Sequence, residues 1–304
     1  MRLPGASRAR RGWVVLSLAS ALAGLACTPP VVRPPAGSGT DPARTGGGSG
    51  SPDAWGLTVP DGGFPDGLEA PAAAQSITVF AHSSDRLFRV DPNSLNVVEV
   101  GRFYLRGLSP PPPVDGMTDI AVDRDGRIIG LTTGQLLQID AFDAGCVVIT
   151  SLPEGRMFNG MSWVRTDGMG EREQLVATGY DGSVFRIDPK SGSSTLLGAL
   201  GGDLRSSGDL VSVALHGTLA TVTGSGTDVL VRVDPATGKA TPIGPMGFVR
   251  VWGLGFWQNR VFGFTDQGQF ISVDPVTGKG TLVRTLPSLH FWGAGVTTSA
   301  PVIQ

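Results

Sequence analysis

Eight polar and aromatic side chains have the chemistry of a small binding site. They lie at or just before the start of apolar segments that we predict as strands: Asp115, Asp119, Asn159, Asp209, Arg250, Trp252, His290 and Trp292. Tryptophan rings beside a few polar groups are typical of ligand pockets, and the aspartates carry the oxygens that a shared cation needs. The alternative is structural, with the tryptophans filling a narrow centre and the acids capping turns. We expect a ligand site here, with no catalytic residue and no metal.

The sequence has none of the familiar catalytic or cofactor motifs. It has no zinc-ligand spacing, phosphate-binding loop, Gly-x-Ser-x-Gly elbow or EF-hand loop, so we expect no cofactor. The segment from Asp123 to Gly126 matches only the start of a calcium loop and is predicted to be a hairpin tip. Cys146 opens an apolar strand without a neighbouring histidine motif, which predicts a buried hydrophobe. His82 and His216 fall in predicted turns, where we expect plain surface residues.

A short phrase that recurs five times defines the elements that must position these side chains. The copies are Leu87–Pro92, Leu136–Asp140, Val184–Pro189, Leu230–Pro235 and Phe270–Pro275. Their aspartates follow one another at steps of 49, 48, 46 and 40 residues. Apolar, often β-branched residues fill each phrase, which is typical of a buried strand. A period of this length with several short strands per unit predicts a β-propeller.

The end of each phrase predicts a tight turn rather than a catalytic acid. In Asp234-Pro235-Ala236-Thr237-Gly238, proline presets φ, aspartate bonds the backbone two residues on, and glycine takes a left-handed conformation. An active site is asymmetric, whereas a turn is needed in every repeat. We therefore interpret the repeated acids as turn residues: Asp91, Asp140, Asp188, Asp234 and Asp274.

The two ends of the repeat region are predicted to close one sheet together. Two further strands precede most phrases and one follows, which gives four strands per blade. The first unit, starting at Ser76, lacks its inner strand, and the C-terminal segment Phe291–Val296 supplies one. We expect this segment to pair with the strand near Ile77–Phe80, which removes the open sheet edges. The predicted fold is all-β, a five-bladed β-propeller over residues 76–304.

The N-terminal region has the pattern of a lipoprotein signal followed by a linker. In residues 1–27, four arginines precede a 14-residue apolar stretch that ends in Ala23-Gly24-Leu25-Ala26-Cys27. This resembles a bacterial lipobox, in which the cysteine is acylated and anchors the chain in the bilayer; an ordinary cleaved signal peptide is the alternative. Thr28 after the cysteine resembles the outer-membrane sorting pattern. Residues 28–75 are rich in proline and glycine and predicted to be disordered.

Charge and composition limit the partners. The whole chain has 24 Lys+Arg and 26 Asp+Glu. Removal of the signal takes away four arginines and no acidic residue, so the remaining chain is more acidic. Without a basic stripe or an interleaved aromatic motif, nucleic acid is not an expected partner. Trp55 and Phe64 are apolar exceptions within the linker, with docking on the propeller or on a partner as alternatives. We expect a monomer.

The phrase Val-Asp-Pro-x-Thr-Gly, seen at Val233–Gly238 and Val273–Gly278, resembles the repeat of bacterial secreted β-propellers of the broad YVTN, NHL and PQQ-like group. The resemblance covers about Ser76 to the C-terminus. It implies the fold but not one function, since these families include enzymes, assembly factors and many members of unknown role. The cofactor-ligand motifs of the quinone-dependent members are not recognisable here.

Two functions are compatible with this sequence. The first, which we favour, is a lipid-anchored, non-enzymatic binding or scaffold module of the cell envelope that contacts another envelope protein or a glycan. The second is a hydrolase or lyase acting on sugars or lactones through acids at the centre of the ring. A glycosidase mechanism requires two opposed carboxyl groups about 5–9 Å apart, so their geometry discriminates between the two functions.

Overall fold

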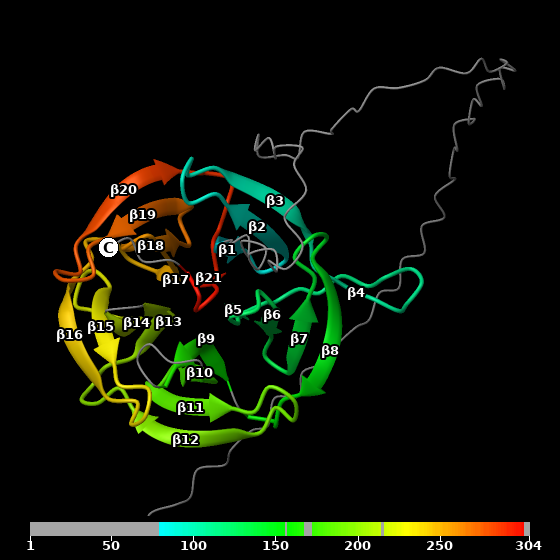
Figure 1. Cartoon of the computed structure of the whole chain (residues 1–304), viewed down its shortest axis with the longest axis horizontal. Helices are drawn as coiled ribbons and strands as arrows, with labels where there is room; N and C mark the ends of the chain where they lie inside the picture. Colours follow the sequence, from blue (N-terminus) through cyan, green and yellow to red (C-terminus); the bar gives the residue numbers. More distant parts are fainter. Residues whose placement is uncertain (1–78, 156, 167–171, 214–215, 301–304) are drawn as a thin grey trace, which may run out of the picture. The chain divides into compact units, whose positions relative to one another are not determined.

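The computed structural model describes residues 79–300 apart from residue 156, residues 167–171 and residues 214–215. The predicted signal, the acylated Cys27 and the linker with Trp55 and Phe64 lie outside the described residues. The described chain consists of strands, turns and loops (Figure 1). Because its assigned elements are all strands, this part of the chain contains no helix that could cross a membrane.

Five antiparallel sheets are arranged around a common centre, as the repeat predicts (Figure 1). From the centre outward, blade 1 contains β21 (Gly293–Val296), β1 (Val79–His82), β2 (Arg86–Val90) and β3 (Val97–Arg102). Blade 2 contains β5 (Asp119–Val122), β6 (Ile128–Leu131), β7 (Gln135–Ile139) and β8 (Gly145–Ser151). Blade 3 contains β9 (Phe158–Arg165), β10 (Glu173–Gly179), β11 (Ser183–Ile187) and β12 (Ser194–Ala199).

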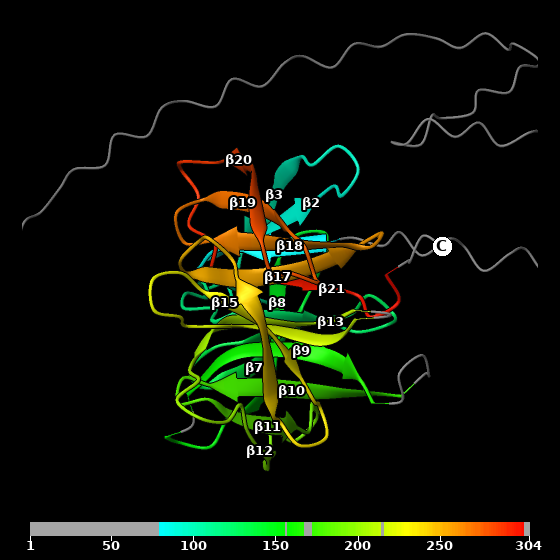
Figure 2. The ribbon, with the colours of Figure 1, turned by 90° about the vertical axis from the view of Figure 1, so that its left-hand side faces the viewer.

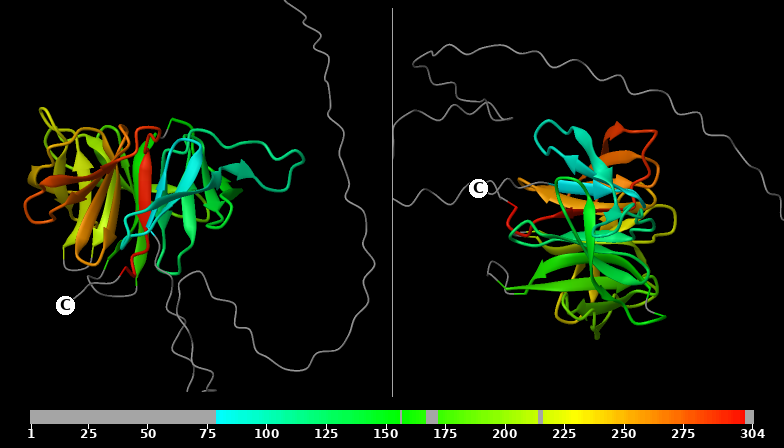
Figure 3. Two further views of the ribbon diagram at one scale, coloured as in Figure 1. Left: turned by 90° about the horizontal axis from the view of Figure 1, so that it is seen from above. Right: turned by 90° about the vertical axis from the view of Figure 1, so that its right-hand side faces the viewer.

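The remaining two blades follow the same order. Blade 4 contains β13 (Ser206–Val213), β14 (Gly217–Val222), β15 (Val229–Val233) and β16 (Ala240–Pro245). Blade 5 contains β17 (Val251–Trp257), β18 (Arg260–Thr265), β19 (Gln269–Val273) and β20 (Gly280–Thr285). A short fifth strand, β4 (Tyr104–Leu105), runs parallel to β8 on the outside of blade 2, and the loop after it projects from the ring (Figure 3).

The C-terminal strand closes the ring, and this prediction is confirmed. Val79 faces Val296 and His82 faces Gly293 in the antiparallel register of β1 with β21. The strand begins two residues later than predicted, because the Phe291 side chain instead enters the core and is fully buried. β21 also lies beside β17 of blade 5, as the side view shows (Figure 2). The chain ends therefore complete one sheet and join it to the next.

The repeated aspartates are turn residues, as predicted. In every copy, the backbone N–H two residues on donates to the aspartate Oδ1 at 2.8 or 2.9 Å. The residue four positions after each aspartate has a positive φ. It is glycine in blades 3, 4 and 5, but Leu95 in blade 1 and Ala144 in blade 2. Turn geometry is thus retained in all five copies even where glycine is absent.

These outer turns also pack on the preceding blade. Gly238, with φ of 73°, leaves no room for a side chain, because a Cβ atom there would lie 2.7 Å from Cβ of Val184 in blade 3. Between neighbouring sheets the core is aliphatic and aromatic, with the rings of Phe264 and Phe291 in edge contact at 5.3 Å. The repeat therefore builds both the blade and the joint between blades.

Candidate functional site

Two of the predicted site residues, Asp119 and Asp209, hold neighbouring inner strands together. Asp119 at the start of β5 accepts the N–H of Ile120 (2.8 Å) and that of Met161 in β9 (2.6 Å). Asp209 in β13 accepts the N–H of Leu210 (2.6 Å) and that of Leu254 in β17 (2.7 Å). Each carboxyl group thus bridges from its own blade to the next. This is the structural role that the sequence left open as an alternative.

The two carboxyl groups are also neighbours. Asp119 and Asp209 are close enough to influence each other's ionisation, and each residue is only 1% exposed. Burial raises the pKa of both groups, and the nearby Asp119 raises that of Asp209 further. The pair is closed to solvent, so it does not have the accessible geometry of a glycosidase pair.

His82 corrects a sequence-based prediction. We expected a surface residue in a turn, but β1 extends through His82 and its side chain is fully buried. Its Nδ1 lies 2.8 Å from the carbonyl oxygen of Ser83, and its Nε2 lies 3.6 Å from Oδ1 of Asp119 without a hydrogen-bond partner. Burial lowers the pKa of His82 to about 4, so the ring is neutral at neutral pH. The prediction failed because the strand continues through His82 and the turn begins only after it.

Two further predicted site residues lie apart from the buried pair. Asp115 is exposed, and His290 is 68% exposed with its Nδ1 3.4 Å from a carboxylate oxygen of Asp266. The three aspartates that could share a cation are therefore not assembled. Within the described residues, no cluster of three or more histidine, cysteine, aspartate or glutamate side chains is arranged to hold a metal ion.

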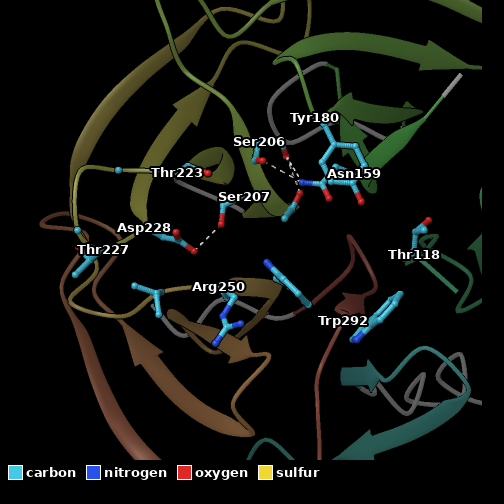
Figure 4. Close-up of a pocket in the computed structure, with 15 residues that line it drawn as sticks. Thr118, Asn159, Tyr180, Ser206, Ser207, Thr223, Thr227, Asp228, Arg250 and Trp292 are labelled. Atoms are coloured by element: carbon cyan, nitrogen blue, oxygen red, sulfur yellow. Dashed lines mark hydrogen bonds between the residues drawn. The ribbon is translucent and has the colours of Figure 1, made fainter. Parts of the chain in front are cut away.

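The other four predicted residues meet in one pocket. Asn159, Arg250, Trp252 and Trp292 come from blades 3 and 5 and from the segment leading into β21, and they line a cavity of about 440 Å³ (Figure 4). The remaining lining residues are mostly small and polar: Thr118, Tyr180, Ser206, Ser207, Gly208, Thr223, Gly224, Gly226, Thr227, Asp228 and Val249. The pocket lies where the inner strands of several blades converge.

Asp228 is the acidic residue of this pocket and was missed by the sequence analysis. Its Oδ2 accepts the hydroxyl of Ser207 at 2.6 Å and the N–H of Val251 at 2.7 Å. Burial raises the pKa of the Asp228 carboxyl, while these hydrogen bonds act in the opposite direction. Asp228 precedes the fourth copy of the repeated phrase, in a loop without a recognisable motif. The proximity of this loop to blade 5 depends on the closed ring.

The aromatic and basic groups have fixed positions. The rings of Trp252 and Trp292 are in edge contact, with centroids 6.2 Å apart and planes at 87°. Nη1 of Arg250 lies 3.1 Å from Oδ2 of Asp266, so an acidic neighbour balances its charge. Arg250 has a φ of 53°, a strained left-handed conformation for a residue with a side chain, directly before β17. The pocket therefore has an aromatic wall and an arginine whose charge is balanced by Asp266.

Cys146 is buried, as predicted. Its Sγ lies 3.4 Å from the carbonyl oxygen of Ala144, and burial raises the pKa of the thiol to about 12. A thiol with so high a pKa is a poor nucleophile at neutral pH. Cys146 belongs to the core of blade 2 and takes no part in the pocket.

Comparisons with known proteins assign no family to the chain. No protein-family model matches the chain, and neither does any curated protein. Similar solved structures include a protein of unknown function from Bacteroides thetaiotaomicron (12% identity, 73% of this chain and 62% of that one, TM-score 0.46). BamB from Moraxella catarrhalis (12%, 67% and 59%, 0.33) and the RRP9 WD40 repeats (14%, 70% and 64%, 0.38) are others. The chain spans about six-tenths of the length of these three structures, and the likeness concerns the fold alone.

Proposed function

We propose that this protein is a lipid-anchored binding module of the bacterial cell envelope, without catalytic activity, whose ligand occupies the pocket at the centre of the propeller. The partner is an envelope glycan or an envelope protein. In this proposal the protein acts as a monomer, anchored through acylated Cys27 and held at the outer membrane. The repeated aspartates and the buried acid pair serve as scaffold.

The anchoring part of the proposal is supported by the sequence. An arginine-rich start, a 14-residue apolar stretch and Cys27 follow one another in the order of a lipoprotein signal. The proline- and glycine-rich composition of residues 28–75 predicts a flexible chain, which would span about 35–40 Å in root mean square. Such a tether is long enough to hold a propeller clear of the lipid surface.

The binding part of the proposal depends on one observation: the polar groups at the centre of the ring form two sets, one buried and one lining the pocket. The acids Asp119 and Asp209 are buried and satisfied by backbone N–H groups, whereas the pocket beside them contains partly exposed aromatic and polar groups. Concave sites with aromatic walls and a few polar groups are the usual places for ligands. A pocket of this kind without an accessible acid pair favours binding over hydrolysis.

Two measurements test the proposal. Expressed in a bacterial host, the full chain should incorporate labelled fatty acid and fractionate with membranes, and a Cys27→Ser variant should do neither. The intact lipoprotein, extracted in mild detergent, should capture a specific envelope component, and Trp292→Ala should lose it. Phe142→Ala is the matched control, since Phe142 is an aromatic side chain 85% exposed on an outer turn. Capture that survives Trp292→Ala would place the binding surface elsewhere.

A further inference from the structure

We propose that the ligand of the central pocket is an uncharged oligosaccharide, bound by its sugar ring against the tryptophans and by its hydroxyl groups through Asn159 and Asp228. This inference rests on the proposed function and specifies its ligand. Three properties of the pocket support it: the form of its aromatic wall, the arrangement of its unpaired hydrogen-bonding atoms, and its balance of charge.

The aromatic wall suits a sugar as ligand better than it suits a planar aromatic ligand. Trp252 and Trp292 meet nearly at right angles, and Tyr180 lines the same cavity (Figure 4). Trp292 is 36% exposed and Tyr180 52% exposed. Perpendicular rings cannot sandwich a planar base, but they form a corner that receives the puckered C–H faces of a pyranose. Large, partly exposed aromatic side chains are also those that gain most from being covered by a ligand.

The pocket also contains polar atoms that have no hydrogen-bond partner among the described residues. Asn159 donates through Nδ2 to the carbonyl oxygen and to the hydroxyl of Ser206, both at 3.1 Å, which leaves its Oδ1 without a donor among the described residues. Both hydrogen bonds of Asp228 are likewise made by Oδ2, so its Oδ1 has no donor within the described chain. Two acceptor oxygens are thus available to ligand hydroxyl groups.

The complementary donors are the indole N–H groups. Neither Trp252 nor Trp292 has a hydrogen-bond partner for Nε1 among the described residues, and the Nε1 of Trp252 is open to solvent, unlike those of Trp163 and Trp257. A sugar hydroxyl both donates and accepts, so a cavity that offers both acceptors and donors matches a polyol. A ligand that only donates or only accepts would leave part of this set unsatisfied.

The charge of the pocket argues against an ionic ligand. Its lining includes one acid, Asp228, and one base, Arg250, which sum to zero. Arg250 is paired with Asp266 at 3.1 Å, so an anionic ligand would have to compete with that carboxylate. A cation would have to approach Asp228 with Arg250 lining the same cavity. The volume, about 440 Å³, falls in the usual range for small-ligand pockets and suits one or two sugar units.

An array of immobilised oligosaccharides tests the inference on the full-length protein in detergent. The array contains uncharged, sialylated and sulfated oligosaccharides, with phosphocholine and a set of peptides as further probes. We expect binding to uncharged oligosaccharides. Trp292→Ala and Asn159→Ala should each weaken it at least about tenfold, a loss typical of a central contact. Phe142→Ala and Asp115→Ala, at exposed positions outside the pocket, should bind as the wild type does.

The contrary outcomes separate this inference from the proposed function. Binding only to acidic glycans, to phosphocholine or to peptides would overturn the uncharged-sugar assignment, and so would binding that is unchanged in Trp292→Ala. If no array probe binds while capture of an envelope component still depends on Trp292, the pocket remains the binding site but its ligand is not a sugar. Circular dichroism and thermal melts of each variant establish that losses of binding do not reflect unfolding.

Discussion

The carboxyl groups of Asp209 and Asp119 are buried neighbours at the centre of the ring, and together they accept four backbone N–H groups, two of which belong to the next blade. A pair of acids at the centre of a ring resembles catalytic machinery. Here each acid accepts one N–H group within its own strand and one from the inner strand of the next blade. The pair is therefore a buried clamp between inner strands.

The clamp predicts a large loss of stability on truncation. Asp209→Ala removes the acceptor of the buried N–H groups of Leu210 and Leu254, and the free energy of unfolding should fall by about 3 kcal/mol. Urea denaturation measures this change. Asp115→Ala, at an exposed aspartate in the segment before β5, should change stability by less than about 0.5 kcal/mol. Equal, small effects at both positions would contradict the structural role.

His82 predicts a loss of stability in acid. Its pKa is lowered from 6.5 to about 4 by burial, so the unfolded chain takes up a proton at a higher pH than the folded one. The contribution of His82 is complete above pH 6.5 and is lost as the pH falls towards 4, by about 3 kcal/mol at most. The raised pKa values of Asp119 and Asp209 act in the opposite sense, since they favour the fold at low pH and lose that contribution as the pH rises.

The His82→Leu variant separates these contributions. Urea denaturation at about pH 7 and about pH 4.5 should show a smaller acid-induced loss of stability in His82→Leu than in the wild type, because the variant has no ring to protonate. The comparison is between the differences across pH for each protein, so a general effect of the substitution cancels. An unchanged difference would mean that another group controls the acid sensitivity.

The same substitution, glycine to alanine, should lower the free energy of unfolding by different amounts at two positions. Gly238 and Gly247 have φ values of 73° and 77°, but only at Gly238 would a Cβ atom collide, with Val184 of the preceding blade. Gly247→Ala should cost about 1 kcal/mol, the strain of a left-handed alanine. Gly238→Ala adds steric overlap and should cost about 3 kcal/mol or more. Similar midpoints of denaturation for the two variants would argue against tight packing between blades 3 and 4.

Removal of the closing strand should abolish cooperative folding. A chain ending at Leu289 lacks β21 and the buried Phe291, and it exposes the edge of β1. Size-exclusion chromatography and thermal melts should show aggregation and a broad transition. A chain ending at Ala300, which keeps β21, is the matched control and should unfold as the full chain does. A cooperative monomer without β21 would contradict the closure.

The blades and their closure could be predicted from the sequence because their signals are local. The phrase ending in Val233-Asp234-Pro235 marks a buried strand and its turn, and the missing strand of the first unit matches the spare strand at Gly293–Val296. The turn survives even at Leu95, where the sequence lacks the usual glycine. Such features need only neighbouring residues.

The side chains that meet at the centre of the ring could be predicted only in part. Asn159, Arg250, Trp252 and Trp292 were found from their position before inner strands, and they line one pocket. The burial of Asp119 and Asp209, the inward position of His82 and the presence of Asp228 depend instead on how the blades meet. Those contacts arise between residues 21 or more positions apart, such as Ser207 with Asp228 and Asp119 with Met161, and no local pattern encodes them.

Fluorine NMR of the full-length protein labelled with 5-fluorotryptophan tests the central claim most directly. Of the tryptophans in the described chain, Trp252 and Trp292 line the pocket, whereas Trp163 and Trp257 have buried indole N–H groups elsewhere. Signals are assigned with single Trp→Phe variants, and cellobiose, maltose and N,N′-diacetylchitobiose are then titrated. We expect at least one of these sugars to shift the Trp252 and Trp292 signals while those of Trp163 and Trp257 stay in place. Shifts confined to Trp163 or Trp257, or no shift with any of the three sugars, would contradict a sugar-binding pocket at the centre of the ring.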